Sequence, residues 1–370
     1  MKASGIPIER LNGGNPLLAP SGKDWESGGT INAAVVYLNR SAENDPLIHG
    51  LIGAESLDSL PDGIAAVYYR AVASPGVENA IPFSSIGLAV FTPDLQRLVR
   101  RFDAPVLEPG TDWESFDYFG IEDPRITCVD GVYFMFYCGP RIDPVNTFKT
   151  RICLATSRDL LHWEKHGPVP GGPDRFENKD GVLFPNRIQD RYFLLHRPWG
   201  AGFAGSDISI WLASSESPFG PWDDLGEILR AYAIPGYRES WVGGGSVPIA
   251  LDEKRYLIIY HTGNYLNDTD REYDMGAALF DFGRFSPTNP RRLVVSRIEP
   301  LMAPETEFEL SQQPDGGRLD VVFPCGSYVF KDDLYLIYGA GDRYTAAARV
   351  RLKVLQDALQ NGSLKNPYLR

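Results

Sequence analysis

The chain has 370 residues, of which 43% are hydrophobic and 23% charged, a balance that excludes an intrinsically disordered protein. Its formal net charge of −12 disfavours a nucleic-acid partner, because an acidic surface repels phosphate backbones. No run approaches the roughly 18 apolar residues of a membrane span, and MKASGIPIERLNGG lacks the apolar core of a secretory signal. We therefore expect a cytoplasmic protein without a membrane partner.

The cysteines and histidines give no sign of a metal site. Their spacing fits neither a zinc site nor a disulfide framework, so we expect buried free thiols. His162 and His166 have a ligand-like spacing, but LLHWEKHG is typical of a solvent-exposed turn. No glycine-rich phosphate loop precedes a helix, so we expect no nucleotide cofactor. The four cysteines are Cys128, Cys138, Cys153 and Cys325.

A three-strand unit recurs five times along the chain. Each copy contains a segment rich in Tyr, Ile, Leu and Val, preceded and followed by another strand-like stretch. The central segments are GIAAVYYRAV, GVYFMFYCGP, DRYFLLHRP, KRYLIIYHTG and DLYLIYGAG. The preceding stretches are NAAVVYLN, EDPRITCVD, KDGVLFPNRI, GGGSVPIAL and LDVVFPCGSYVF, and the following ones are IGLAVF, ICLATS, IWLASS, MGAALF and TAAARV.

The spacing of the copies leaves room for four short strands in each. Tyr192 follows Tyr133 by 59 residues, and Tyr335 follows Tyr256 by 79. A four-stranded unit repeated five times is typical of a β-propeller, which leaves only short protected strand edges. We therefore predict an all-β fold, a five-bladed β-propeller forming one catalytic domain over residues 1–370. A short C-terminal helix is predicted within ARVRLKVLQDALQNG.

Polar residues gather at the start of the first strand of each copy. The innermost strands of a propeller line its axis, so these side chains should converge at one mouth, although Asp and Asn also favour turns. They are Asn32 in copy one, Glu122, Asp123 and Arg125 in copy two, Lys179 and Asp180 in copy three, Gly243 to Gly245 in copy four, and Asp320 in copy five. In a regular strand Arg125 shares a face with Asp123, and Glu122 points the other way unless Pro124 distorts it.

Several ordered blocks resemble glycoside hydrolase family 130, which contains β-mannoside phosphorylases and β-1,2-mannosidases built as five-bladed propellers. The blocks are GIEDPRIT, NKDGVLFPNRI, LLHRP, VGGGSVPI, IIYHTG, DVVFPCG and YGAGD. The resemblance runs from about Asn15 to Arg351. It implies exo-acting, inverting cleavage of β-D-mannosidic bonds in manno-oligosaccharides.

By this resemblance Asp123 is the general acid and Asp342 binds hydroxyls of the terminal mannose. An inverting enzyme needs an acid on the leaving-group side and a nucleophile on the opposite face of the sugar. The residues that we expect to contact the sugar are Asn32, Arg125, Asp180, Trp241, Tyr260, His261, Phe323 and Asp342. Core packing is an equal alternative for Tyr260, His261 and Phe323.

Members of the family differ in the nucleophile that attacks the sugar, which is phosphate in the phosphorylases and water in the hydrolases. Lys179 and Arg197 match two of the three basic residues with which the family's phosphorylases bind phosphate, but the third position is Trp241, with Arg238 nearby. This departure favours hydrolysis, with Glu239 or Glu272 as candidate bases and Trp241 as a stacking platform. The alternative is phosphorolysis to mannose 1-phosphate, with inorganic phosphate as co-substrate and no other cofactor.

Two alternative functions remain, a glycosidase of another kind and a non-catalytic binding protein. Arabinanases, xylosidases and invertase-like enzymes share the fold but use three acids, and INAAVVYLN lacks the early one. A non-catalytic propeller would have a polar central funnel without clustered acidic and basic residues. The linkage cleaved, the chain length accepted and a homo-oligomeric state are not readable from the sequence.

Overall fold

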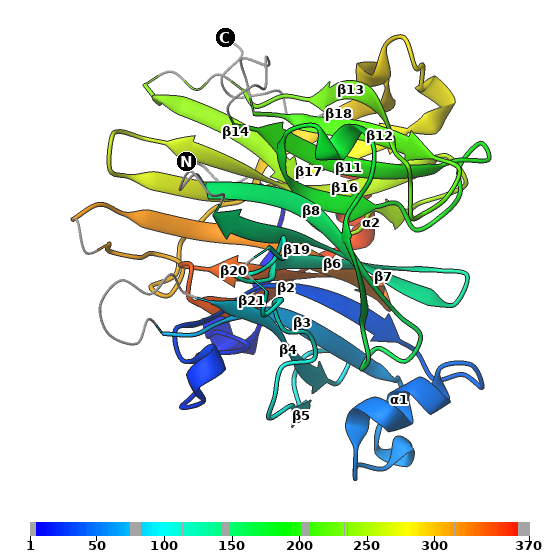
Figure 1. The fold of residues 1–370 in the computed structure, drawn as a ribbon, viewed down its shortest axis with the longest axis vertical. Helices are drawn as coiled ribbons and strands as arrows, with labels where there is room; N and C mark the ends of the chain where they lie inside the picture. The colour runs from blue at the N-terminus through cyan, green and yellow to red at the C-terminus, as the bar shows by residue number, and fades with distance from the viewer. Residues whose placement is uncertain are drawn as a thin grey trace.

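The computed structural model describes residues 5–74, 83–112, 114–142, 148–200, 208–232, 234, 236–313 and 316–361. In these residues the fold is mostly β, with 21 strands and two α-helices (Figure 1). Three antiparallel sheets of four strands follow one another along the chain. They consist of β2 (Gly29–Leu38), β3 (Ile64–Val72), β4 (Ser84–Phe91) and β5 (Leu98–Arg101); β6 (Glu122–Val129), β7 (Val132–Ile142), β8 (Phe148–Ser157) and β9 (Glu164–Pro168); and β10 (Glu177–Leu183), β11 (Tyr192–Trp199), β12 (Ile210–Ser215) and β13 (Asp223–Leu229).

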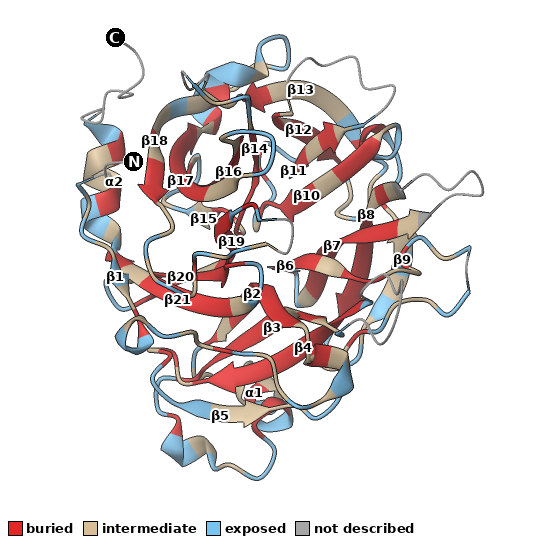
Figure 2. Cartoon of the chain, turned by 90° about the vertical axis from the view of Figure 1, so that its left-hand side faces the viewer, coloured by how far each residue is buried: buried red, intermediate tan, exposed pale blue. Residues whose placement is uncertain are grey.

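The remaining strands form a nine-stranded sheet with two antiparallel halves. The first half holds β14 (Glu239–Gly244), β15 (Ile249–Ala250), β16 (Arg255–Tyr265), β17 (Arg271–Asp281) and β18 (Val294–Met302), and the second holds β19 (Leu319–Phe330), β20 (Asp333–Ala340), β21 (Tyr344–Arg351) and β1 (Glu9–Arg10). The halves join through a short parallel pairing in which residues 271–273 of β17 lie beside residues 319–321 of β19. The five first strands, β2, β6, β10, β14 and β19, lie around a common centre (Figure 2).

Apolar side chains pack between consecutive sheets and between the last sheet and the first. This covers both faces of the middle strands, which explains why a segment such as Ile64 to Tyr69 is continuously apolar and does not alternate. Five buried clusters make these contacts, and each contains residues of two neighbouring sheets. One pair from each cluster is Tyr68 with Met135, Phe134 with Leu194, Phe193 with Tyr256, Leu257 with Leu336, and Ile337 with Val67.

The repeated segments predicted from the sequence all overlap strands, and helix α2 (Leu352–Gln360) lies within the segment predicted to hold a C-terminal helix, after the last residues of β21. Two details differ. Helix α1 (Asp45–Ile52) was not predicted. Cys128 is exposed, whereas the other three cysteines are buried and all four are free thiols. No helix in the described ranges is long and apolar enough to cross a membrane.

A buried ion pair attaches the beginning of the chain to the last sheet. Strand β1 pairs with β21, and Arg10 donates to both carboxylate oxygens of Glu309 at 2.8 and 2.9 Å. The Glu309 side chain is fully buried and also accepts from the Tyr338 hydroxyl and the amides of Glu305 and Thr306. These donors outweigh the effect of burial and lower the pKa of Glu309.

We predict that Glu309→Gln lowers the free energy of unfolding by about 3 kcal/mol, because it leaves the Arg10 charge without its buried partner. Lys353→Gln is the control, since the Lys353–Asp357 pair is exposed and such pairs contribute at most about 1 kcal/mol. Urea unfolding of both variants measures the difference. Equal losses would contradict the assigned role of the pair.

Candidate active site

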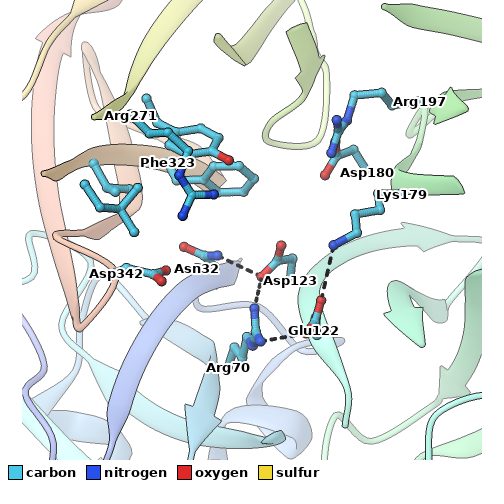
Figure 3. A pocket seen from close by; sticks show the side chains of 13 residues that line it. Asn32, Arg70, Glu122, Asp123, Lys179, Asp180, Arg197, Arg271, Phe323 and Asp342 are labelled. Carbon is cyan, nitrogen blue, oxygen red and sulfur yellow. Dashed lines mark hydrogen bonds and ion pairs between the residues drawn. The ribbon is translucent and has the colours of Figure 1, made fainter. Parts of the chain in front are cut away.

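A pocket of about 190 Å³ opens where the first strands of the sheets converge (Figure 3). Seven of the sequence-predicted residues line it: Asn32, Asp123, Lys179, Asp180, Arg197, Phe323 and Asp342. Six further residues line it that were not predicted as ligands: Arg70, Glu122, Arg271, Tyr273, Leu319 and Val321. The convergence of charged groups of both signs in one concavity is typical of an active site.

Left-handed backbone conformations turn short polar side chains into this pocket. Asn32, Asp123 and Asp180 have φ values of 47°, 52° and 57°, and each coincides with a register shift between the first and second strands of its sheet. Such bulges re-aim a side chain, and Asn and Asp tolerate the left-handed region better than other L-residues. Asp342, with φ of 54°, reaches the pocket from the turn between β20 and β21.

The bulge at Asp123 overturns the strand alternation assumed from the sequence. Glu122 and Asp123 both line the pocket, whereas Arg125 lies beneath it with only 1% of its surface exposed. Its guanidinium donates to the backbone oxygens of Asp123, Gly244 and Gly245 at 2.7, 3.1 and 3.0 Å. Arg125 therefore supports the floor of the pocket and does not line it.

Asp123 accepts hydrogen bonds from two neighbouring side chains of the first sheet. The Asn32 amide donates to its Oδ1 at 2.8 Å, and the Arg70 guanidinium lies 3.5 Å from the same oxygen. Arg70 also pairs with Glu122 at 2.6 Å. Burial alone would lower the pKa of Arg70, but the nearby carboxylates outweigh it and raise the pKa. At Asp342 burial has the larger effect. Burial and repulsion from Asp123 and Glu122 raise the pKa of Asp342, and the attraction of Arg70 only partly offsets them.

Three further cations face the pocket. Lys179 Nζ lies 3.6 Å from Glu122 Oε2, and Arg197 Nε lies 2.5 Å from Asp180 Oδ2. Within the described part of the chain Arg271 has no carboxylate within ion-pair distance, and its guanidinium lies 5.7 Å from the centroid of the Tyr265 ring. Its charge is therefore available to an anionic ligand.

A buried imidazole lies behind the pocket wall. His261 is fully buried, its ring centroid is 4.2 Å from that of Phe323, and its Nε2 is 3.7 Å from Asp180 Oδ2. Burial, together with the positive charges of Arg197 and Arg125, lowers the pKa of His261 to about 3. The pKa of Asp180 is lowered as well, because attraction by these cations exceeds the effect of burial.

Several sequence candidates lie outside the pocket. Trp241 is buried against the rings of Tyr265 and Tyr273, at centroid distances of 5.3 and 5.5 Å, and offers no stacking platform. Tyr260 is buried and donates to Glu299 at 2.6 Å. Three charged candidates are also absent from the pocket lining: Arg238, which is exposed and pairs with Asp268, and the two candidate bases Glu239 and Glu272.

Arg271 and Tyr273, which the sequence did not single out, enter the pocket through the parallel pairing of β17 with β19. Glu272 lies between them and projects to the other face of β17, because side chains alternate along a regular strand. Arg70 lies near the end of β3, on the second strand of its copy, whereas only first strands were searched. A charged residue in an otherwise apolar strand end was the available signal for Arg70.

Comparison with known proteins agrees with this geometry. Residues 76–361 match the sequence model of a family described as β-1,4-mannooligosaccharide phosphorylase. The chain belongs to glycoside hydrolase family 130. It is 31% identical to a 1,2-β-oligomannan phosphorylase of Thermoanaerobacter sp. over 94% of this chain and 98% of that protein. It is 28% identical to a β-1,2-mannobiose phosphorylase of the same organism over 90% and 94%.

Among solved structures, this family 130 chain is similar to the β-1,2-mannobiose phosphorylase of Listeria innocua in complex with β-1,2-mannobiose. The TM-score is 0.71 with 23% sequence identity, and the alignment covers 96% of this chain and all of the other. At this identity the likeness establishes the shared fold.

The neutral His261 imidazole makes stability depend on pH. Its pKa is about 3 in the fold and about 6.5 in an unfolded chain, so the unfolded state binds more protons and stability falls as the pH drops below 6.5. We predict that His261→Gln reduces the loss of unfolding free energy between pH 7 and pH 5 by up to about 2 kcal/mol. Urea unfolding at both pH values measures it, with the exposed His49→Gln as control. A loss as large as in the wild type would mean that His261 is not held neutral.

Proposed function

We propose that this protein is an inverting, exo-acting phosphorylase of β-1,2-linked manno-oligosaccharides that releases α-mannose 1-phosphate. This replaces the hydrolysis favoured from the sequence, where the aromatic residue at position 241 was taken to remove a phosphate ligand. The observation that carries the proposal is the set of cations around the pocket, above all Arg271, which lines it without an ion pair among the described residues. The names of the relatives support the same reaction and linkage.

A dianionic phosphate needs several donors in a partly dry site, and Lys179, Arg197 and Arg271 supply them. The Tyr273 hydroxyl adds a fourth donor. The pKa of Tyr273 is raised by burial, although Arg197, Arg271 and Lys179 act in the opposite direction, so the phenol lies within the field of all three cations. Hydrolysis would instead require a carboxylate that activates water. The two candidate bases, Glu239 and Glu272, lie outside the pocket lining, and Glu122 and Asp180, which line it, are each paired with an arginine.

In this mechanism Asp123 donates its proton to the glycosidic oxygen while a phosphate oxygen attacks the anomeric carbon from the opposite face. The bond from that carbon to the leaving sugar breaks as the bond to phosphate forms, which inverts the configuration. Asn32 and Arg70 stabilise the Asp123 carboxylate that results, since both donate to its Oδ1. Asp342 binds hydroxyls of the mannose that is transferred.

We also propose that the three four-stranded sheets and the two halves of the nine-stranded sheet are the five blades of one propeller domain. The support is that apolar clusters join each sheet to the next, and that the cluster of Val67 and Ile337 joins the first sheet to the last. Family membership and the charged pocket favour an enzyme of this kind over an arabinanase-like glycosidase or a non-catalytic scaffold.

Product analysis tests the reaction. With β-1,2-mannobiose we expect mannose 1-phosphate and mannose in equal amounts when phosphate is present, and almost no cleavage when it is absent. Asp123→Asn should lower kcat by at least 100-fold, because general acid catalysis contributes about 10²–10⁴ in rate. Release of mannose alone, independent of phosphate, would refute phosphorolysis.

Phosphate affinity tests the role of Arg271. We predict that Arg271→Met raises the KM for phosphate by about 10- to 100-fold, since a hydrogen bond to a charged group contributes about 1.5–3 kcal/mol. Arg238→Met is a matched control, because its guanidinium lies 5.8 Å from the same Tyr265 ring but outside the pocket. An unchanged KM for phosphate in Arg271→Met, or equal changes in the two variants, would rule out Arg271 as a phosphate ligand.

A further inference from the structure

We propose that four aromatic residues beside the pocket form a subsite for the second and later sugars on the leaving side of the cleaved bond. These residues, Phe83, Phe116, Tyr118 and Phe119, are called the aromatic rim. The inference rests on the proposed function of the pocket and extends it to substrates longer than a disaccharide.

Two separate segments of the chain bring three rings of the aromatic rim together. The Phe83 ring lies 6.1 Å from the centroids of both Tyr118 and Phe119, and the latter two rings are 5.0 Å apart. The rim is open to solvent, since Phe83 is 43% exposed and Phe116, two residues before Tyr118 in the sequence, is 36% exposed. Exposed aromatic groups that adjoin a polar pocket are typical of a ligand groove.

The aromatic rim is continuous with the wall of the pocket that holds the general acid. Phe119 precedes Glu122 by three residues, and Phe83 directly precedes β4. Ser84 and Ile121 join the two segments, because the Ile121 amide donates to the Ser84 carbonyl at 2.9 Å and the Ser84 hydroxyl donates back to the Ile121 carbonyl at 3.1 Å. The rim therefore begins beside Glu122 and Asp123.

The approach of these segments depends on a glycine between the rim and the acid. Gly120 has a φ of 141°, and a Cβ added to it would lie 2.4 Å from the Ser84 hydroxyl. Only glycine accommodates both the backbone conformation and the contact. The rim is thus held against β4, which pairs with the strand that carries Arg70, as Ile86 of β4 is the register partner of Arg70.

A polar anchor, and not burial of the rings, holds the second segment in place. The buried Asp117 carboxylate accepts from the Gly110 amide at 2.9 Å, the Tyr137 hydroxyl at 3.0 Å and Lys165 Nζ at 2.6 Å. On either side of this anchor, Phe116 and Tyr118 stay at least partly exposed. A surface whose rings are already fixed loses little conformational entropy when it binds a ligand.

The chemistry of the aromatic rim fits a pyranose ring. A sugar has an apolar face of C–H groups and a polar edge, and an aromatic ring offers the complementary apolar face. The Arg141 guanidinium, 4.9 Å from the Phe116 ring centroid, places hydrogen-bond donors beside that face. Because Asp123 protonates the leaving sugar, the next sugars extend along the wall to which the acid belongs.

Substrate length tests the proposal. We expect Phe83→Ala and Phe116→Ala to keep the kcat/KM for β-1,2-mannobiose within about twofold of the wild type and to lower that for β-1,2-mannotetraose by about five- to tenfold. Phe219→Ala is a matched control, because Phe219 is also 43% exposed but packs against Phe134 and His166 away from the pocket. Equal effects on both substrates, or no effect on either, would overturn the proposal.

A binding experiment separates this proposal from the choice of nucleophile. Calorimetric titration of Asp123→Asn with mannotetraose, without phosphate, should give a Kd at least fivefold lower than the same titration of Asp123→Asn carrying Phe116→Ala. Thermal unfolding verifies that each variant is folded. If the wild type releases mannose without phosphate, the proposed phosphorolysis fails, but this binding difference still decides whether the aromatic rim holds sugars.

Discussion

The pocket depends on one buried guanidinium. Arg125 comes from β6, donates to backbone oxygens of β6 and of the residues around the end of β14, and lies 3.4 Å from the Asp180 carboxylate of β10. It thereby ties together the first strands of three sheets at the point where each turns a polar residue toward the axis. A charge this deeply buried is tolerated only when it is fully paired and hydrogen-bonded, so the three strand ends cannot separate without a large cost.

This constraint shapes the electrostatics of the site. Asp180 pairs with Arg125 below and with Arg197 above, which fixes Arg197 by its Nε and leaves the rest of its guanidinium toward the cavity. Lys179, Glu122 and Arg70 form a second chain of ion pairs that ends at Asp123. Lys179 lies beside Asp180 and Arg197, so the second chain begins next to the first and leads from there past Glu122 and Arg70 to Asp123 (Figure 3).

The strands were predictable from the sequence because each middle strand is covered on both faces and therefore appears as a continuous apolar run, as in Ile64 to Tyr69. Asp123, Lys179 and Arg197 were predictable because they lie in blocks shared with the family. Alternation along a strand misplaced Glu122 and Arg125, since a bulge shifts the register at Asp123. Arg271 and Tyr273 could not be found from sequence, because their position depends on a parallel pairing between segments that carry no local signal for it.

The pairing of β1 with β21 has a consequence for how the chain is made. The last sheet takes its outer edge from the beginning of the polypeptide, where residues near Arg10, Leu11 and Leu18 bond along β21. During synthesis β1 has no strand partner until more than three hundred further residues have been made, as Arg10 pairs with Ala348. Contacts of such high sequence separation form slowly, and an uncovered strand edge invites pairing with another chain. The newly made polypeptide is thus vulnerable to self-association until β1 and β21 pair.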